Sequence, residues 1–195
     1  DKSVLDYLVN EVLPNVAPAD QALVSNNIRN AIFGIARDRE TFNEMGKKKP
    51  YIEKIASMVG VNFAELPEEI HFSGQGDALI CGDYLFVGTT YRTSPKAHYY
   101  LEKHTGLHVI SLQTVPQLNS GGDLVINKVT GWPDSFFYDL DLALAVISPS
   151  CIAWCPEAFT PESRTKIRSI ADIEKIEVSL HEAMHGFACN LVSTG

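Results

Sequence analysis

Two histidines and a glutamate near the end of the sequence, in "SLHEAMHGFACN", form the pattern His-Glu-x-x-His. On a helix, His181 and His185 lie on one face and can share a zinc ion, with Glu182 as the general base of a metallopeptidase. The same residues fit a capping box, because Ser179 precedes Glu182 by three positions at a helix start. No acid or histidine follows His185 as a third ligand. We therefore interpret the segment as a capped helix with surface histidines and expect no metal; a zinc peptidase is the most distant alternative.

A recurring acid is the second chemical pattern. Asp20, Asp77 and Asp141 each precede an apolar, strand-like run, and Asn190 takes this place in a partial fourth run. If these runs pack around an axis, the four side chains converge on one pocket. Close carboxylates raise each other's pKa unless a cation lies among them, and a planar guanidinium matches carboxylates bidentately. The alternative is that each Asp only caps a turn before a strand.

Composition restricts the class of protein. With 195 residues, 45% hydrophobic and 21% charged, the chain suits one soluble globular domain. A net charge of −8 argues against a nucleic-acid partner. No apolar run is long enough to span a bilayer, no signal peptide is visible, and Asp1 suggests a trimmed N-terminus. The four cysteines are interpreted as buried free thiols in a reducing intracellular or organellar compartment.

A repeated unit must position the acids. Three segments read as hairpins: "ADQALVSNNIRNAIFGIA", "GDALICGDYLFVGTTY" and "LDLALAVISPSCIAWC". Each is followed by a helical segment and a further strand. Two of the helices have Ser94 or Thr160 at the N-cap, and two end at Gly60 or Gly106. The unit is therefore strand, strand, helix, strand, and we predict an α/β fold in which such ββαβ units form a ring that is incomplete at both ends.

Residues 1–195 are predicted to form a single domain. Its expected parts are a partial repeat 1–18, repeats at about 19–66, 67–113 and 138–178, and a partial repeat 179–195. The irregular segment 117–137 fits an inserted hairpin or a partner-binding loop. "FACNLVSTG" reads as a first strand without its hairpin partner, so we expect a trimmed piece or a chain that ends against a protein partner.

The sequence resembles the guanidine-modifying superfamily of pentein fold, which includes arginine deiminases, dimethylarginine dimethylaminohydrolases and amidinotransferases. The resemblance lies in "SGQGDALICGDYLFVGTTYRTSPKAHYYL", "FFYDLDLALAVI", "AFTPESRTKIR" and "EVSLHEAMHGFACNLVSTG". It implies a five-bladed ring of ββαβ units around a central site. There a Cys attacks the guanidinium carbon, a His acts as acid and base, and carboxylates hold the nitrogens. It implies no cofactor.

Carried over by the resemblance, Asp77 and Asp141 match the family's Asp positions in Gly-x-Gly-Asp and His-Leu-Asp, and Asp20 matches an acidic or amide position less closely. This sequence departs from the family at two positions: Ser73 stands where the acid is expected, and Asp139 where the His is expected. An Asp with an ordinary pKa of about 3.9 is an anion at neutral pH and cannot protonate a leaving amine. The matching nucleophilic Cys would lie beyond Gly195, and Cys189 is in the wrong unit.

Three functions remain open. The leading hypothesis is a degenerate, non-catalytic member that serves as a binding or structural subunit, with a guanidine or other cationic small molecule and a protein partner as expected ligands. Its expected site comprises Asp77, Asp139 and Asp141 as remnants of the catalytic set, and Asp20, Asp77, Asp141 and Asn190 as substrate-binding residues. The alternative is an active hydrolase or amidinotransferase acting on arginine-type guanidines. The zinc peptidase is the third.

Overall fold

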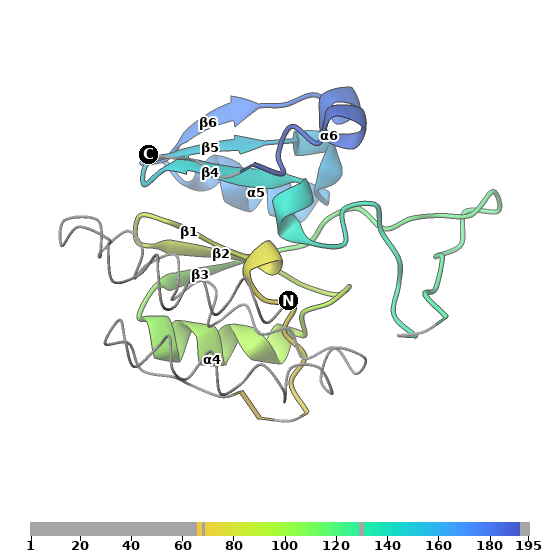
Figure 1. Cartoon of the computed structure of the whole chain (residues 1–195), viewed down its shortest axis with the longest axis horizontal. Coiled ribbons are helices and arrows are strands. Elements are labelled where there is room, and N and C mark those ends of the chain that lie inside the picture. The colour runs from red at the N-terminus through yellow and green to blue at the C-terminus, as the bar shows by residue number, and fades with distance from the viewer. Residues whose placement is uncertain (1–65, 68, 129–130, 192–195) are drawn as a thin grey trace, which may run out of the picture.

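Two small sheets with the same strand order form the body of the molecule. The computed structural model describes residues 66–67, 69–128 and 131–191. The first unit begins with a short 3-10 helix, η3 (Gln75–Asp77). The elements that follow are β1 (Ala78–Cys81), β2 (Tyr84–Gly88), α4 (Pro95–Thr105) and β3 (His108–Leu112). Strand β1 pairs antiparallel with β2, and β2 pairs parallel with β3 across the α4 crossover (Figure 1).

The second unit repeats this order. It consists of η4 (Leu140–Leu142), β4 (Leu144–Ser148), β5 (Cys151–Trp154), η5 (Pro156–Ala158), α5 (Pro161–Ser169) and β6 (Glu174–Glu177), and α6 (Leu180–Gly186) follows it. Strands β4 and β5 are antiparallel, and β5 and β6 are parallel. The α/β fold of repeated ββαβ units that the sequence predicts is therefore the fold observed.

Local signals account for the helix boundaries. The Thr160 side chain accepts a hydrogen bond from the Ser163 backbone N–H at 3.4 Å and caps α5. Gly106 ends α4 in the left-handed conformation, at φ 69°. One prediction was incomplete: Ser94 occupies the N-cap position of α4, but its side chain makes no capping hydrogen bond. Pro95 at the first helical position fixes the entry into this helix instead.

The first sheet is covered on both faces, which explains its nearly continuous apolar sequence. Successive side chains of a strand point to opposite faces. Leu85 and Val87 of β2 pack with Ala97 and Leu101 of α4. Phe86, between them in sequence, is fully buried in the other cluster, which it shares with residues of the second unit such as Trp154.

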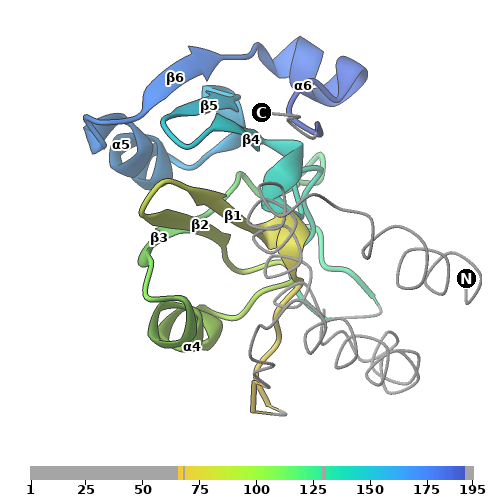
Figure 2. The ribbon, with the colours of Figure 1, turned by 60° about the vertical axis from the view of Figure 1, so that its left-hand side comes forward.

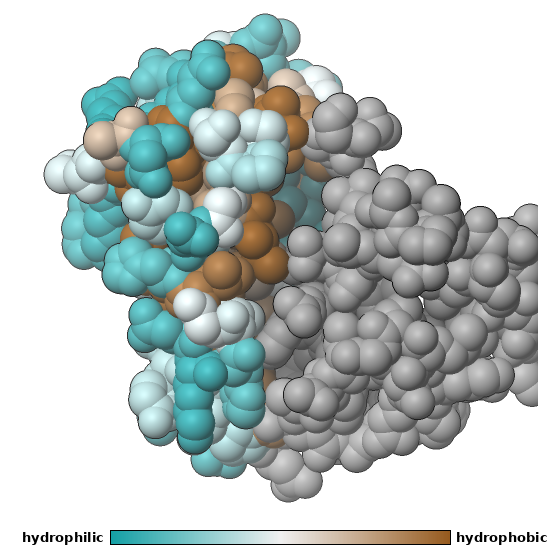
Figure 3. Space-filling model, turned by 90° about the vertical axis from the view of Figure 1, so that its left-hand side faces the viewer, coloured by the Kyte–Doolittle hydropathy of each residue, from teal (hydrophilic) through white to brown (hydrophobic). Residues whose placement is uncertain are grey.

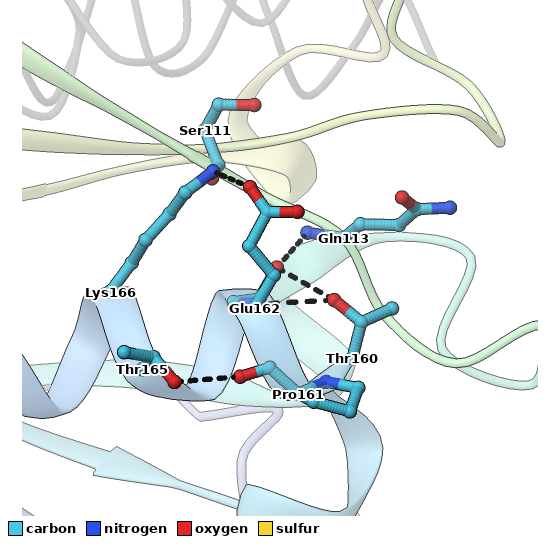
Figure 4. Close-up of polar contacts among 8 residues, drawn as sticks. Ser111, Gln113, Thr160, Pro161, Glu162, Thr165 and Lys166 are labelled. Atoms are coloured by element: carbon cyan, nitrogen blue, oxygen red, sulfur yellow. Dashed lines mark hydrogen bonds and ion pairs between the residues drawn. The ribbon is translucent and has the colours of Figure 1, made fainter.

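Figure 2 shows how the two units face each other, and polar contacts join them beside α5 (Figure 4). The Gln113 backbone N–H donates to Ser163 Oγ at 2.8 Å, and the Thr160 N–H donates to the Gln113 carbonyl at 3.0 Å. Lys166 Nζ donates to the Ser111 carbonyl at 3.2 Å. The N-terminal half of α5 is therefore held against the chain that leaves β3, which fixes one unit relative to the other.

An extended arm links the units and projects from the body of the molecule (Figure 1). Isolated antiparallel bridges pair Leu118 with Leu124 and Ile126 with Pro133. Of the two sequence-based alternatives for this segment, the structure supports an inserted hairpin. Figure 3 shows a different side of the molecule, where hydrophobic side chains are visible between more hydrophilic regions.

One predicted strand does not form. Phe187 ends α6 in the left-handed conformation, at φ 49°, and residues 188–190 make a turn, so the described part of "FACNLVSTG" is not a strand. The N–H groups of Ala188 and Asn190 donate to Glu182 and Phe187 carbonyls, and these local bonds replace a ladder. The predicted units 1–18 and 19–66 lie almost wholly outside the described residues. No helix in the described part of the chain is long and apolar enough to cross a membrane.

Candidate functional site

Three carboxylates gather where η3 of the first unit meets η4 of the second. Asp77 ends η3, Asp139 is the N-cap of η4, and Asp141 lies within η4. A side chain carbon added to Gly76 would lie 3.3 Å from both Asp139 Oδ2 and Asp141 Oδ2. The Leu140 backbone N–H donates to Asp77 Oδ1 at 3.1 Å. Elements far apart in the sequence thus bring the acids Asp77, Asp139 and Asp141 together, and we call this group the acidic cluster.

Asp77 is the most buried member of the cluster, with 3% of its surface exposed. Burial raises the pKa of its carboxyl to about 7, and the nearby Asp139 charge adds to this shift, while a hydrogen bond from Thr93 opposes it. Gly88 at the end of β2 makes room for the group: a Cβ there would lie 1.7 Å from Asp77 Oδ1. Glycine at 88 is therefore a condition for the position of Asp77.

Asp139 is held from two sides. Ser73 Oγ donates to Asp139 Oδ1 at 2.7 Å, and Arg92 Nη1 donates to Oδ2 at 2.6 Å. The Arg92 guanidinium also lies over the Tyr138 ring, with 5.1 Å between Cζ and the ring centroid. Both oxygens of Asp139 thus accept hydrogen bonds, and the one from Arg92 is charge-assisted.

Asp141 is half-buried and lies beside the Asp139 charge. Burial raises the pKa of Asp141 to about 6; the Asp139 charge raises it further and Arg92 lowers it. The cluster therefore holds one carboxyl that is paired with Arg92 and two whose raised pKa values let them gain or lose a proton near neutral pH. An added cation would favour ionisation of both.

The site differs from the sequence-based prediction in two details. Asp141 does not directly precede its strand, because it lies inside η4 and Ala143 comes before β4. A spacing of two would place Asp139 and Asp141 on the same side of a regular strand, but Asp139 is the N-cap of η4 and Asp141 lies within it. Their carboxylates still approach the same glycine, Gly76, because the turn folds the backbone back between them.

The sequence also predicted that Asp20 and Asn190 would line the pocket, and the described residues place neither of them in the acidic cluster. Asp20 lies outside the described residues. Asn190 is exposed, in the turn after α6, so the strand start from which it was expected to face the pocket is not formed.

Sequence reasoning missed Arg92, Thr93 and Gly88. Arg92 and Thr93 follow β2 in the segment "TTYRTSP", which joins β2 to α4. Thr93 is fully buried, and its hydroxyl accepts from the Ser73 N–H at 3.1 Å. The available signal for these residues was a basic residue next to a threonine, in the segment between a buried strand and a helix. The partner of Arg92, however, is 47 positions away in the sequence.

The His-Glu-x-x-His segment is a helix start. The predicted capping box is present, with the Ser179 N–H donating to Glu182 Oε2 at 3.1 Å. Hydrogen bonds from Ser179 lower the pKa of Glu182. The exposed rings of His181 and His185 lie 4.7 Å apart. Within residues 66–67, 69–128 and 131–191, no group of three His, Cys, Asp or Glu side chains is arranged to hold a metal ion.

All four cysteines are free thiols as predicted, but only Cys81, Cys155 and Cys189 are buried, and Cys151 is half-buried. Burial raises the pKa of Cys81 to about 11 and that of Cys189 to about 12, and it also raises the pKa of Cys155. An attacking cysteine needs the opposite shift, because the thiolate is the nucleophile.

Comparison with known proteins gives relatives that act on arginine and its derivatives. The chain is 26% identical over 162 residues, 82% of its length, to the bifunctional arginine dihydrolase/ornithine cyclodeaminase AgrE of Nostoc sp.. It is 32% identical over 122 residues, 63% of its length, to the N(G),N(G)-dimethylarginine dimethylaminohydrolase of Mycobacterium tuberculosis. The chain spans 20% of the first relative and 34% of the second. No family model matches the chain.

Solved structures show the same architecture. The N-terminal domain of ArgZ, a cyanobacterial arginine dihydrolase, bound to its product, has a TM-score of 0.59 and 27% identity; the similarity covers 76% of this chain and 49% of that one. A Cys-to-Ala variant of AgrE in complex with L-arginine has a TM-score of 0.60 and 27% identity, over 76% of this chain and 20% of that one.

Proposed function

The chain belongs to the guanidine-modifying superfamily of pentein fold, and we propose that it is a degenerate member, which binds an arginine-type guanidinium at the acidic cluster without converting it. The cluster supplies what such a ligand requires. A guanidinium has five N–H donors in a planar fork, and carboxylate oxygens accept them in pairs. The AgrE and ArgZ structures described above contain L-arginine or the reaction product, which supports the same ligand class here.

The proposal that the ligand is bound without being converted depends on the contacts of Asp139. The family resemblance expects a histidine at this position, to pass protons between nucleophile, ligand and water. Asp139 instead accepts hydrogen bonds from Ser73 and Arg92, so both of its oxygens are engaged as acceptors and no imidazole is present to relay protons. Loss of a general acid–base group costs a factor of about 10²–10⁴ in rate.

The buried cysteines of the described residues are not suited to act as the nucleophile. The thiols of Cys81, Cys155 and Cys189 have raised pKa values, so each is protonated at neutral pH. A protonated thiol in apolar surroundings is a poor nucleophile. These three thiols are therefore not the nucleophile, and the cysteine that matches the family's nucleophile is expected beyond Gly195.

Binding and turnover can be measured together on the full-length protein. Calorimetry with L-arginine and with agmatine should show binding, while chromatography after prolonged incubation should show no citrulline, ornithine or ammonia. Asp141→Asn should weaken binding by about 10- to 100-fold, because a charge-assisted hydrogen bond contributes about 1.5–3 kcal/mol. Asp83→Asn, at an exposed aspartate of the β1–β2 turn, is the matched control and should leave affinity unchanged. If the wild-type protein binds neither compound, guanidine binding at the cluster is excluded.

A second candidate is an active hydrolase or amidinotransferase that uses a cysteine other than Cys81, Cys155 and Cys189. The pKa values of Asp77, about 7, and Asp141, about 6, favour it, because these carboxyls can carry a proton near neutral pH. The curated relatives named above are enzymes, which also favours it. Steady release of citrulline or ornithine from arginine, abolished by Asp77→Asn, would establish this candidate and refute the non-catalytic one.

A further inference from the structure

The acidic cluster already contains a guanidinium, and it is the protein's own. Arg92, in the segment between β2 and α4, donates from Nη1 to Asp139 Oδ2 at 2.6 Å. Its positive charge also lowers the pKa of Asp77 and of Asp141, so it acts on all three carboxyls of the cluster. This chemical group is the one that the cluster is proposed to take from solution.

The ion pair between Arg92 and Asp139 is exposed enough for a ligand to replace Arg92. The Arg92 side chain is 38% exposed, whereas that of its partner Asp139 is only 14% exposed. The guanidinium rests on Tyr138, itself an exposed residue, and not within the core. A partly exposed arginine side chain can rotate away into water while the backbone that carries it stays in place. The carboxylate it leaves stays fixed by Ser73.

We infer that Arg92 is a specificity-determining residue, an internal guanidinium that a cationic ligand must displace from Asp139 in order to bind. The inference rests on the proposed guanidine-binding function and adds a competitor to it. A free guanidinium can use its whole fork of donors on several carboxylates and so outcompete Arg92. A primary ammonium is a compact point charge without that planar fork, and it gains less from the exchange. Arg92 therefore favours guanidines over amines.

The test compares Arg92→Gln with Arg168→Gln in the full-length protein. Arg168 is a close match in chemistry: it pairs with Glu177 at 3.4 Å and lies over the Trp154 ring at 5.7 Å, but it belongs to α5. Affinities are measured by calorimetry for agmatine, L-arginine and the diamine cadaverine. We expect Arg92→Gln to bind agmatine about fivefold more tightly than the wild type, the effect of removing one partly exposed ion pair. Its preference for agmatine over cadaverine should narrow, and Arg168→Gln should match the wild type.

Each other result has a definite meaning. If the wild type binds agmatine and Arg92→Gln binds it equally or more weakly, the inference is wrong and the proposed function stands. If Arg92→Gln loses affinity for L-arginine but not for agmatine, Arg92 contacts the ligand carboxylate and is no competitor. If neither protein binds any of the three compounds, the proposed function fails, and the inference with it. Binding by the variant alone would support the inference.

Discussion

Asp77→Asn tests whether a buried carboxyl of the acidic cluster is maintained at a cost to stability. The pKa of Asp77 is about 7 in the folded protein, against an ordinary value of 3.8. Below 3.8 the carboxyl is protonated in both the folded and the unfolded state. Between 3.8 and about 7 only the folded state retains the proton, so stability falls as pH rises, by about 1.4 kcal/mol per pH unit. Above about pH 7 the full penalty is present.

Asparagine has nearly the same shape and no charge to lose. Its carbonyl can still accept from the Leu140 N–H, and its amide can donate to the Thr93 hydroxyl. We therefore expect Asp77→Asn to be more stable than the wild type by about 1 kcal/mol at pH 4.5 and by about 2–4 kcal/mol at pH 8. The titration of Asp141 is present in both proteins and largely cancels in the comparison.

The assay is urea unfolding followed by tryptophan fluorescence at pH 4.5, 6 and 8. Urea is required because guanidinium chloride is itself a candidate ligand. Asp83→Asn, which removes an exposed carboxyl, controls for net charge and should have the pH dependence of the wild type. If Asp77→Asn is no more stable than the wild type at pH 8, the carboxyl is not desolvated as the structure indicates. A confirmed gain would show that Asp77 is retained at a cost to stability, which is a property of many functional-site carboxyls.

Three further substitutions or treatments test other parts of the structure. Gly88→Ala places a carbon 1.7 Å from Asp77 Oδ1; we expect a loss of about 1–3 kcal/mol in urea unfolding and weaker guanidine binding, and an unchanged protein would contradict the packing. Phe86→Ala empties the cluster shared by the two units and should cost about 3–5 kcal/mol; a loss below 1 kcal/mol would show that the units do not share a core. Excess chelator should leave the melting temperature unchanged, and elemental analysis should find no stoichiometric zinc; zinc that is lost on replacing His181 would refute the capped-helix interpretation.

Local sequence signals were sufficient for most of the elements. Apolar, strand-like runs on either side of a Gly- or Ser-containing turn predicted the hairpins β1–β2 and β4–β5. Thr160, Gly106 and the Ser179–Glu182 box predicted helix ends, because a cap acts within one turn of its own helix. Local hydrogen bonds also explain why the strand expected directly after α6 is not formed. The N–H groups of Ala188 and Asn190 donate to nearby carbonyls, and this part of the chain forms a turn.

The sequence by itself determined the repeated ββαβ unit and the presence of acids at recurring positions, since both are written in patterns of a few residues. Only the tertiary structure decided what those acids do. Asp139 receives its hydrogen bonds from residues 66 and 47 positions away, and Asp77 accepts one from a residue 63 positions away. Their charge states depend on burial and on neighbouring charges, which no short pattern contains. For the same reason Arg92, an ordinary basic residue in the sequence, becomes the cation of the acidic cluster only when the two units pack together.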